Sequence, residues 1–158
     1  MKTSQAVRQM EPLFTRILSA QRKHLFGSKP LFEKYRAASD VANIETKIGA
    51  SLPATLKAWL AAVGYGDLNE VLSFRSEWFN IIDRCELKGH VIFAQDIVGN
   101  FYSFARADGA IHFISRSAPE FAFLAKHFGA FMEELEQRNF QLEEWTGSLK
   151  PQRYDWDT

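Results

Sequence analysis

Two short segments, residues 96–100 and residues 108–109, hold the acidic residues, amide and glycines that metal-binding and phosphate-binding loops use. A calcium loop of the EF-hand type needs oxygen ligands at alternate positions and a distal Glu. The first segment, Asp-Ile-Val-Gly-Asn, has such ligands only at its two ends, so we predict a turn without a metal. Asp-Gly between two strand-like runs is the standard signal of a two-residue hairpin turn, because Gly tolerates positive φ and Asp can bond to its own backbone. The residues expected to define the two turns are Asp96, Gly99, Asn100, Asp108 and Gly109.

The other residues that could carry catalytic chemistry are scattered along the chain. The sequence lacks the His-Glu-x-x-His and Cys-x-x-Cys metal motifs, the Gly-x-Ser-x-Gly nucleophile motif and a Walker-type phosphate loop. We therefore predict a protein that is not an enzyme and that needs no cofactor or metal. His90 and His112 could meet across neighbouring strands, either as ligands or as packed side chains. The alternative is an enzyme site assembled from distant residues such as His90, His112, Asp83 and Arg106.

The composition is that of one soluble globular domain. The chain has 158 residues, of which 46% are hydrophobic and 24% charged, and this length suits a single domain with its own core. No apolar run approaches the roughly 20 residues of a membrane span, and the first residues lack the apolar segment of a signal peptide. The single cysteine, Cys85, cannot form an internal disulfide. These observations predict a cytoplasmic protein that does not bind a membrane.

The formal net charge is zero, which gives no general attraction to nucleic acid. The charge is nevertheless unevenly distributed. Residues 1–36 contain eight basic and two acidic residues, a net charge of +6, so the remainder carries −6. A group of glutamates lies near the other end of the chain, at Glu133, Glu134, Glu136, Glu143 and Glu144. Either these are solvated helix faces that attract each other or water, or they form a dipolar surface that orients a charged partner.

Three segments have helical periodicity. The first runs from Thr3 to Phe26 and contains Pro12, which indicates a kink or a first turn. The second runs from Asp40, a possible N-cap, to Ile48, and Gly49 ends it. The third begins at Pro53, which suits a first helical turn, and Gly64 ends it. The apolar side chains that it aligns on one face are Leu56, Trp59, Leu60 and Val63.

The period then becomes strand-like. We expect the sequence at 64–68, Gly-Tyr-Gly-Asp-Leu, to be a helix stop and a loop, because its glycines follow a helix and not a strand. Apolar and aromatic runs at 71–74, 77–83, 90–96, 100–107 and 110–117 predict strands. The last three are apolar on both faces, which is typical of strands covered on both sides. The segment from Pro119 is either a helix or a strand over 121–125 that leads into a helix over 128–138.

These elements predict an α+β fold, with a mixed, mostly antiparallel sheet and helices packed around it in a single domain. We divide the chain into a basic N-terminal helical region at 1–39, a core at 40–138, and an acidic, aromatic tail at 139–158. The tail contains two Trp and one Tyr in polar surroundings. Because exposed aromatic residues are costly, we expect it to dock on the core.

The order of these features resembles the SUKH superfamily, also described as the Smi/Knr-type domain. The resemblance covers roughly residues 40–138. It rests on a Glu and an Ile-Gly before a Leu-Pro helix start, on an apolar strand that leads into Asp and Gly-Asn, and on a closing Phe-x-x-Phe helix. The matching residues are Glu45, Ile48, Gly49, Leu52 and Pro53, then Phe93, Ala94, Asp96, Gly99 and Asn100, then Phe128, Phe131 and Met132. Two departures are the basic N-terminal region and the loop at 64–70, where the pattern has Asn-Gly.

The resemblance implies a non-enzymatic module that binds a protein. Many bacterial members resemble immunity proteins, which neutralise a cognate toxin domain, and this is the function that we expect. The alternative is a regulatory or scaffold protein that binds an endogenous protein partner. Aromatic and arginine side chains commonly anchor such contacts, and the candidate partner-binding residues are Trp78, Phe79, Arg84, Asp67 and Glu70. For Trp78 and Phe79 the alternative is that they fill the core.

Overall fold

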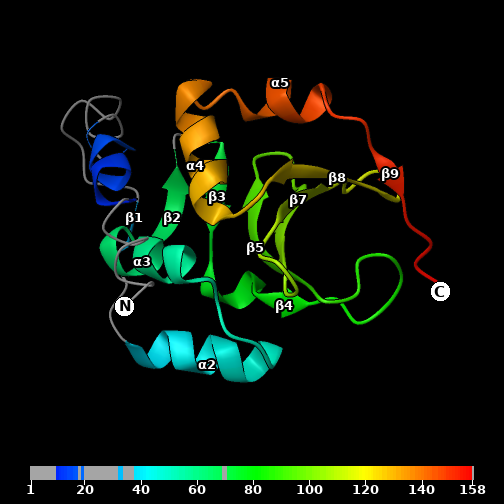
Figure 1. The fold of residues 1–158 in the computed structure, drawn as a ribbon, viewed down its shortest axis with the longest axis horizontal. Helices are drawn as coiled ribbons and strands as arrows, with labels where there is room; N and C mark the ends of the chain where they lie inside the picture. The colour runs from blue at the N-terminus through cyan, green and yellow to red at the C-terminus, as the bar shows by residue number, and fades with distance from the viewer. Residues whose placement is uncertain (1–9, 18, 20–31, 34–37, 69–70, 158) are drawn as a thin grey trace.

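The computed structural model describes residues 10–17, 19, 32–33, 38–68 and 71–157 (Figure 1). Residues 10–17 are helical. The further helices are α2 (Ala38–Ile48), α3 (Ala54–Ala62), α4 (Phe128–Gln137), α5 (Leu142–Gly147) and the 3-10 turn η1 (Ser76–Trp78). The strands are β1 (Phe32–Glu33), β2 (Tyr65–Leu68), β3 (Leu72–Phe74), β4 (Asn80–Ile81), β5 (His90–Asp96), β6 (Phe101–Ala105), β7 (Ile111–Ile114), β8 (Glu120–Ala125) and β9 (Gln152–Arg153).

Within the described residues, the nine strands form one sheet in the order β1-β2-β3-β5-β6-β7-β8-β9. Strands β3 and β4 both pair with β5, at successive positions along it. Every pairing in this part of the chain is antiparallel. The predicted α+β class is therefore confirmed, and the parallel pairs that a mixed sheet would allow do not occur among these strands.

The helices that the sequence predicts are present. Helix α2 ends at Ile48, and Gly49 has φ +67; the helix begins at Ala38, so Asp40 lies inside its first turn and not at its N-cap. Pro53 is the N-cap residue of α3. The N-terminal helix is confirmed only over 10–17, and the rest of the predicted span lies outside the described residues.

A glutamate links α2 to α3. The Glu45 carboxylate accepts a hydrogen bond from the backbone N–H of Leu52 at 2.7 Å and pairs with Lys57 Nζ at 3.1 Å. Leu52 lies just before the first turn of α3, where backbone N–H groups have no helical partner. Glu45 therefore satisfies a backbone donor just before α3 and joins the end of α2 to the start of α3.

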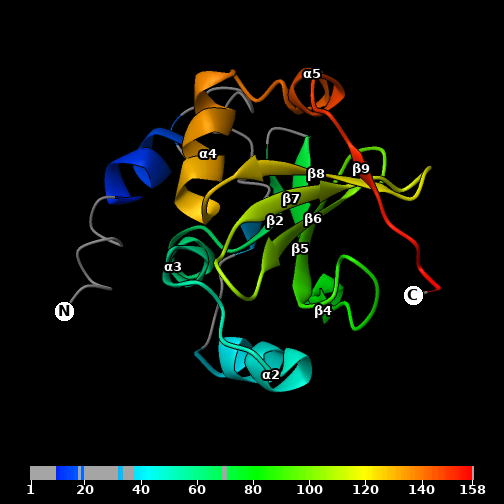
Figure 2. The same ribbon diagram turned by 45° about the vertical axis from the view of Figure 1, so that its right-hand side comes forward.

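The main core lies between the sheet and helices α3 and α4, which cover one of its faces (Figures 1 and 2). Trp59 of α3 is fully buried, with its ring 5.6 Å from that of Phe74 on β3 and 6.3 Å from that of Phe128 on α4. Phe14 of the N-terminal helix contacts the same ring at 5.2 Å between centroids. The aromatic content of the sequence is thus concentrated in one connected cluster.

Two local expectations about strands were wrong. The segment after α3 is not only a loop, since Tyr65–Leu68 forms β2 and pairs with β3. The run at 77–83 is mostly not a strand, because its start belongs to η1 and only Asn80–Ile81 pairs with β5. In both places, pairing with a neighbouring strand decides the conformation, and a local pattern does not contain that information.

The segment after Pro119 is the strand β8 followed by α4, which was the second of the two alternatives. The tail contacts the rest of the protein through α5, whose Trp145 is buried, and through β9, which pairs with β8. No helix in the described residues is both long and apolar enough for a membrane span.

Candidate functional site

A row of residues crosses the sheet on the face opposite α3 and α4. The strand register places Ser73, Gln95, Phe101, Ile114 and Phe121 opposite one another on five neighbouring strands. Residues that are directly opposite in a sheet point to the same face. The row is polar on β3 and β5 and becomes apolar from β6 onwards.

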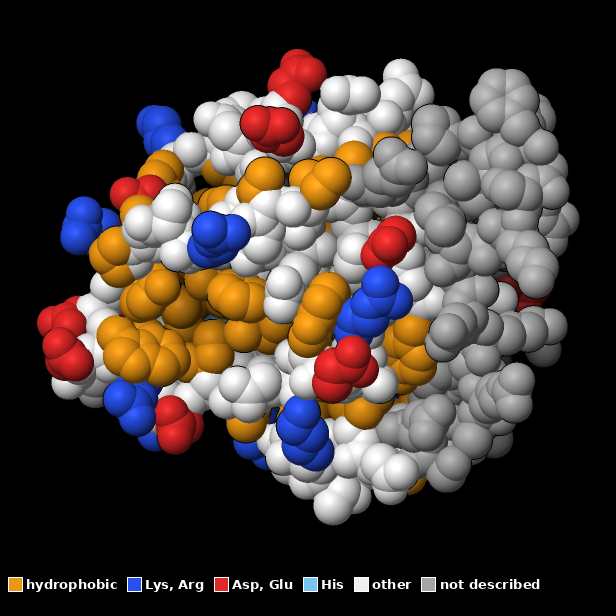
Figure 3. Space-filling model, turned by 180° about the vertical axis from the view of Figure 1, so that it is seen from behind, with side chains coloured by type: hydrophobic (Ala, Val, Ile, Leu, Met, Phe, Trp, Pro, Cys, Tyr) orange, Lys and Arg blue, Asp and Glu red, His pale blue; other side chains and the backbone are white. Residues whose placement is uncertain are grey.

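This face carries a second apolar cluster. On the sheet it consists of Ile92, Phe101, Ile114 and Phe121, of which Ile114 and Phe121 are buried. His112 and Phe123 adjoin these side chains through ring contacts, and Phe123 is exposed. We call these six residues the open face. The cluster is completed by the segment 82–87 and by Tyr154, and none of its members belongs to a helix. Figure 3 shows a continuous, partly hollowed apolar area on this side, with charged side chains of both signs around it.

Aromatic rings form a chain across the open face. The centroid distances are 6.5 Å from Trp156 to Tyr154, 6.3 Å from Tyr154 to Phe121, 6.0 Å from Phe121 to His112, and 5.8 Å from His112 to Phe123. Phe123 is 53% exposed and Trp156 is 48% exposed, so the chain ends in solvent on both sides. Large apolar side chains exposed to this extent favour contact with another molecule.

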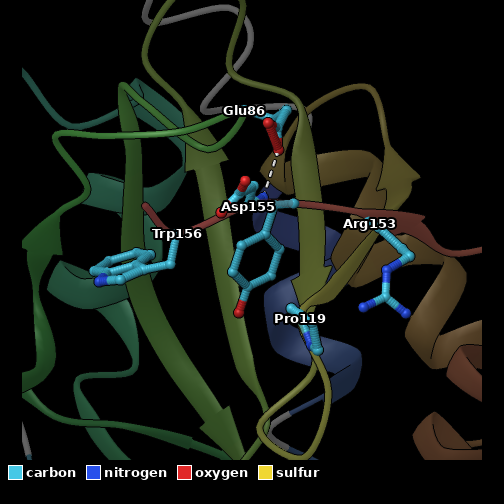
Figure 4. A pocket seen from close by; sticks show the side chains of 6 residues that line it. Glu86, Pro119, Arg153, Asp155 and Trp156 are labelled. Carbon is cyan, nitrogen blue, oxygen red and sulfur yellow. Dashed lines mark hydrogen bonds between the residues drawn. The ribbon is translucent and has the colours of Figure 1, made fainter. Parts of the chain in front are cut away.

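A cavity of about 450 Å³ adjoins the Trp156 end of this chain (Figure 4). It is lined by Glu86, Pro119, Arg153, Tyr154, Asp155 and Trp156. Glu86 Oε2 accepts a hydrogen bond of 3.0 Å from the backbone N–H of Asp155, which attaches the C-terminal segment to the loop before β5. The Arg84 guanidinium carbon lies 5.1 Å from the centroid of the Trp156 ring, within cation–π range. The cavity therefore has aromatic walls and charged groups of both signs.

Two histidines pack against each other on this side of the sheet. The rings of His90 on β5 and His112 on β7 are 4.7 Å apart, and they meet over Ser103 of the intervening β6. His90 Nδ1 is 3.1 Å from the Ser103 hydroxyl oxygen. Burial, followed by the charge of His112, lowers the pKa of His90 to about 4. Burial also lowers the pKa of His112, so both rings are neutral near pH 7.

The pair of His90 and Ser103 has the geometry of a base beside a hydroxyl nucleophile. Ser103 is fully buried, however, and its oxygen cannot reach a substrate in this conformation. Asp83 pairs with its neighbour Arg84 at 3.4 Å and points into solvent. The cavity beside Trp156 is lined by none of the residues of the alternative enzyme site. In the described part of the chain, no three His, Cys, Asp or Glu residues are placed to hold a metal.

The candidate partner-binding residues that the structure describes take part in different contacts. Phe79 is fully buried, so the core interpretation holds for this residue and it is not a surface anchor. Trp78 is half-buried and lies 5.9 Å from the guanidinium carbon of Arg75, which pairs with Asp67 at 3.3 Å. Arg84 instead contacts the ring of Trp156, and Glu70 lies outside the described residues.

The turn at 96–100 matches its prediction closely. The Asp96 carboxylate accepts hydrogen bonds from the backbone N–H groups of Val98 and Asn100, from the Asn100 side-chain amide and from the Tyr102 hydroxyl, at 2.9–3.1 Å. Gly99 has φ +91. Both carboxylate oxygens are thus used by donors of the turn and of the strand that follows it, so the group organises the turn. Burial, and then the charge of Asp96, raises the pKa of Tyr102.

The second turn differs in length from its prediction. Asp108 Oδ1 accepts from the backbone N–H of Ala110, and Gly109 has φ +78, as expected for a turn. The backbone pair that closes the hairpin is Ala105 with Ala110, so the loop contains four residues and not two. The sequence signal located the turn but not the last pair of the ladder.

Sequence reasoning missed Phe123 and Trp156, the most exposed aromatic side chains of the site. Their types were visible, but their exposure depends on which face of β8 has no helix and on the course of the residues after β9. Arg75 was also missed, although it joins Asp67 and Trp78. Comparison of the chain with protein-family profiles, with characterised proteins and with solved structures found no match.

Proposed function

We propose that this protein is a non-enzymatic, cytoplasmic protein-binding module that uses the open face and the adjoining cavity, and that its partner is a cognate bacterial toxin domain, which it neutralises. The observation that carries the binding role is the exposure of Phe123 and Trp156 at the two ends of one connected aromatic chain. The toxin as partner is supported by the resemblance of the motif order at 40–138 to the SUKH superfamily.

The mechanism follows from the composition of the surface. A partner that covers Phe123 and Trp156 removes apolar area from water, which is favourable by about 25 cal/mol per Å² before ordering costs. Phe123 lies on the paired strand β8, and the Trp156 ring is held by Tyr154 and Arg84, so little conformational freedom is lost on binding. Arg84, Glu86 and Arg153 surround the cavity and would select the partner by charge. Neutralisation would then occur by covering the toxin's active site.

Co-expression tests the function directly. Expression of the toxin gene that neighbours this gene should kill cells, and co-expression of this protein should restore growth. The double variant Phe123→Ser, Trp156→Ser should remove protection and weaken binding of the purified toxin domain at least tenfold, because large exposed anchors carry much of an interface's energy. Gln137→Ala, an exposed change on α4, is the matched control and should protect as the unaltered protein does. Equal killing with and without the unaltered protein would exclude the toxin as partner.

The alternative is a regulatory or scaffold role with an endogenous protein partner. Both roles use the same surface. The double variant therefore tests whether this surface binds a partner, and the co-expression experiment tests which partner it binds. If no toxin is neutralised but an endogenous protein binds, and the double variant loses it while Gln137→Ala retains it, the open face is the binding surface and the partner is regulatory.

A further inference from the structure

A second exposed apolar site lies at the turn between β5 and β6. Ile97 is 76% exposed and Val98 is 55% exposed, the two highest values among the large hydrophobic residues described. Their side chains make no contribution to the hydrogen bonds that build the turn, which use Asp96, Asn100 and the backbone. Polar residues would serve the turn equally well, so folding gives no reason for this pair.

The turn holds this pair in a fixed conformation. Arg116, from the neighbouring turn after β7, donates from Nη1 to the carbonyl oxygen of Val98 at 2.9 Å, and its own N–H donates to Asn100 Oδ1 at 2.9 Å. A Cβ placed on Gly99 would lie 3.0 Å from Arg116 Cδ, so the two turns are closely packed. A pre-organised surface loses little entropy when a partner binds.

A small cavity lies beside the pair. It has a volume of about 80 Å³ and lies between this turn and helix α5, which run side by side in Figures 1 and 2. Its lining residues are Val71, Asp96, Ile97, Val98, Asn100, Leu142, Glu143 and Thr146. A water takes about 30 Å³ in the liquid, so the cavity has room for the end of one aliphatic side chain.

The rim of the cavity is acidic. Glu143 lines it, and Glu144 follows in the first turn of α5 and is exposed. Neither glutamate is among the ion pairs formed within the described part of the chain. Arg116 adds one positive charge where it donates to the Val98 carbonyl, so the two glutamates leave this group of three side chains with a net charge of −1. Charge complementarity therefore favours a cationic group next to the apolar contact.

We propose that the tip formed by Ile97 and Val98, with its cavity against α5, binds a protein segment that carries an aliphatic side chain flanked by lysine or arginine. The aliphatic side chain enters the cavity, and the basic residues face Glu143 and Glu144. This binding site extends the proposed function and rests on it only in assuming that the partner is a protein. The tip and the open face are changed by different variants, so failure at one does not decide the other.

A defined peptide tests the tip. The probe is the capped pentapeptide Lys-Lys-Leu-Lys-Lys, added to the isotope-labelled full chain while the backbone amide NMR signals are followed. We expect concentration-dependent shifts at Ile97, Val98 and Thr146. The Glu-Glu-Leu-Glu-Glu and Lys-Lys-Ser-Lys-Lys peptides should bind at least tenfold more weakly. Ile97→Ser with Val98→Ser should weaken the first peptide about tenfold, while Phe123→Ser on the open face should bind it normally. The unshifted remainder of the spectrum shows that each variant is folded.

Several results would overturn the proposal. These are equal binding of the basic and acidic leucine peptides, shifts that fall on the open face, and no shift up to about 10 mM peptide, a concentration that detects even very weak binding. A further such result is that the Ile97→Ser, Val98→Ser variant sediments with a lower molecular mass than the unaltered protein. The occupant of the tip would then be a second copy of this chain, and the proposed segment would be excluded.

Discussion

The buried histidine pair predicts a specific loss of stability in acid. The pKa of His90 is lowered from 6.5 to about 4, so the unfolded chain binds its proton more readily than the folded protein. The stabilising contribution of neutral His90 is therefore complete above about pH 6.5 and is lost progressively as the pH falls towards 4. The pKa of His112 is also lowered, which acts in the same direction.

The size of the effect follows from proton linkage. For one group with these two pKa values, the free energy of unfolding falls by about 2.5 kcal/mol between about pH 7.5 and about pH 4.5. With a urea m-value of about 2 kcal/mol per molar, this is a decrease of about 1 M in the unfolding midpoint. Carboxylates titrate in the same range, so the measurement must be a difference between variants.

The perturbation is His90→Asn, which keeps a polar atom near Ser103 and removes the titrating ring. Urea unfolding of both proteins at the two pH values should show that the free energy of unfolding falls less in the variant than in the unaltered protein, by about 2–3 kcal/mol. Ile92→Val, which trims the neighbouring apolar cluster at a cost of about 1 kcal/mol, is the matched control and should keep the full pH dependence. NMR titration of the His90 ring should give a midpoint near 4. If unaltered protein and His90→Asn lose stability in parallel, the burial argument is refuted.

The other predictions concern the turns and the core. Asp96→Ala removes the acceptor of four hydrogen bonds and should cost about 2–4 kcal/mol in urea unfolding, against about 1 kcal/mol for Asp108→Ala, which removes one. Gly99→Ala should lower the thermal midpoint by several degrees, because φ is +91 and a Cβ would lie 3.0 Å from a neighbouring side chain. An unchanged midpoint would show that the turn accommodates a side chain at this position. Phe79→Ala should cost about 3–5 kcal/mol, as a fully buried ring does, whereas Trp78→Ala should cost clearly less; equal losses would place both rings in the core.

The turns and helices were predictable because their signals are local. Asp96, Gly99 and Asn100 interact within a few residues of one another, and the carboxylate meets its donors wherever the strands lie. Helix α3 likewise begins at its proline and aligns its apolar face within a few turns. The charges were not local in this sense. Arg16 of the basic region forms hydrogen bonds of 3.0–3.2 Å with Glu136 of the acidic group, 120 residues away, and the sequence left open whether these charges attract each other or orient a partner.

The errors in the sheet came from pairing that the sequence does not express locally. Tyr65–Leu68 forms a strand because β3 lies beside it, and the hairpin around Asp108 closes at Ala105 because the ladder between β6 and β7 ends there. A residue's propensity for a strand is only a preference for a paired and half-buried position. The neighbour that supplies the pair is a property of the folded chain.

By itself, the sequence determined the α+β class, the two turns of the meander, the main helices and the residue types available for binding. Only the tertiary structure decided which of those residues reach solvent. Trp78 and Phe79 are neighbours, yet one is half-buried and the other fully buried. Phe123 is exposed because no helix described packs on that face of β8, while Phe128, five residues later, is enclosed between helix and sheet. Exposure depends on what covers a side chain, and the residues that do so are distant in the sequence.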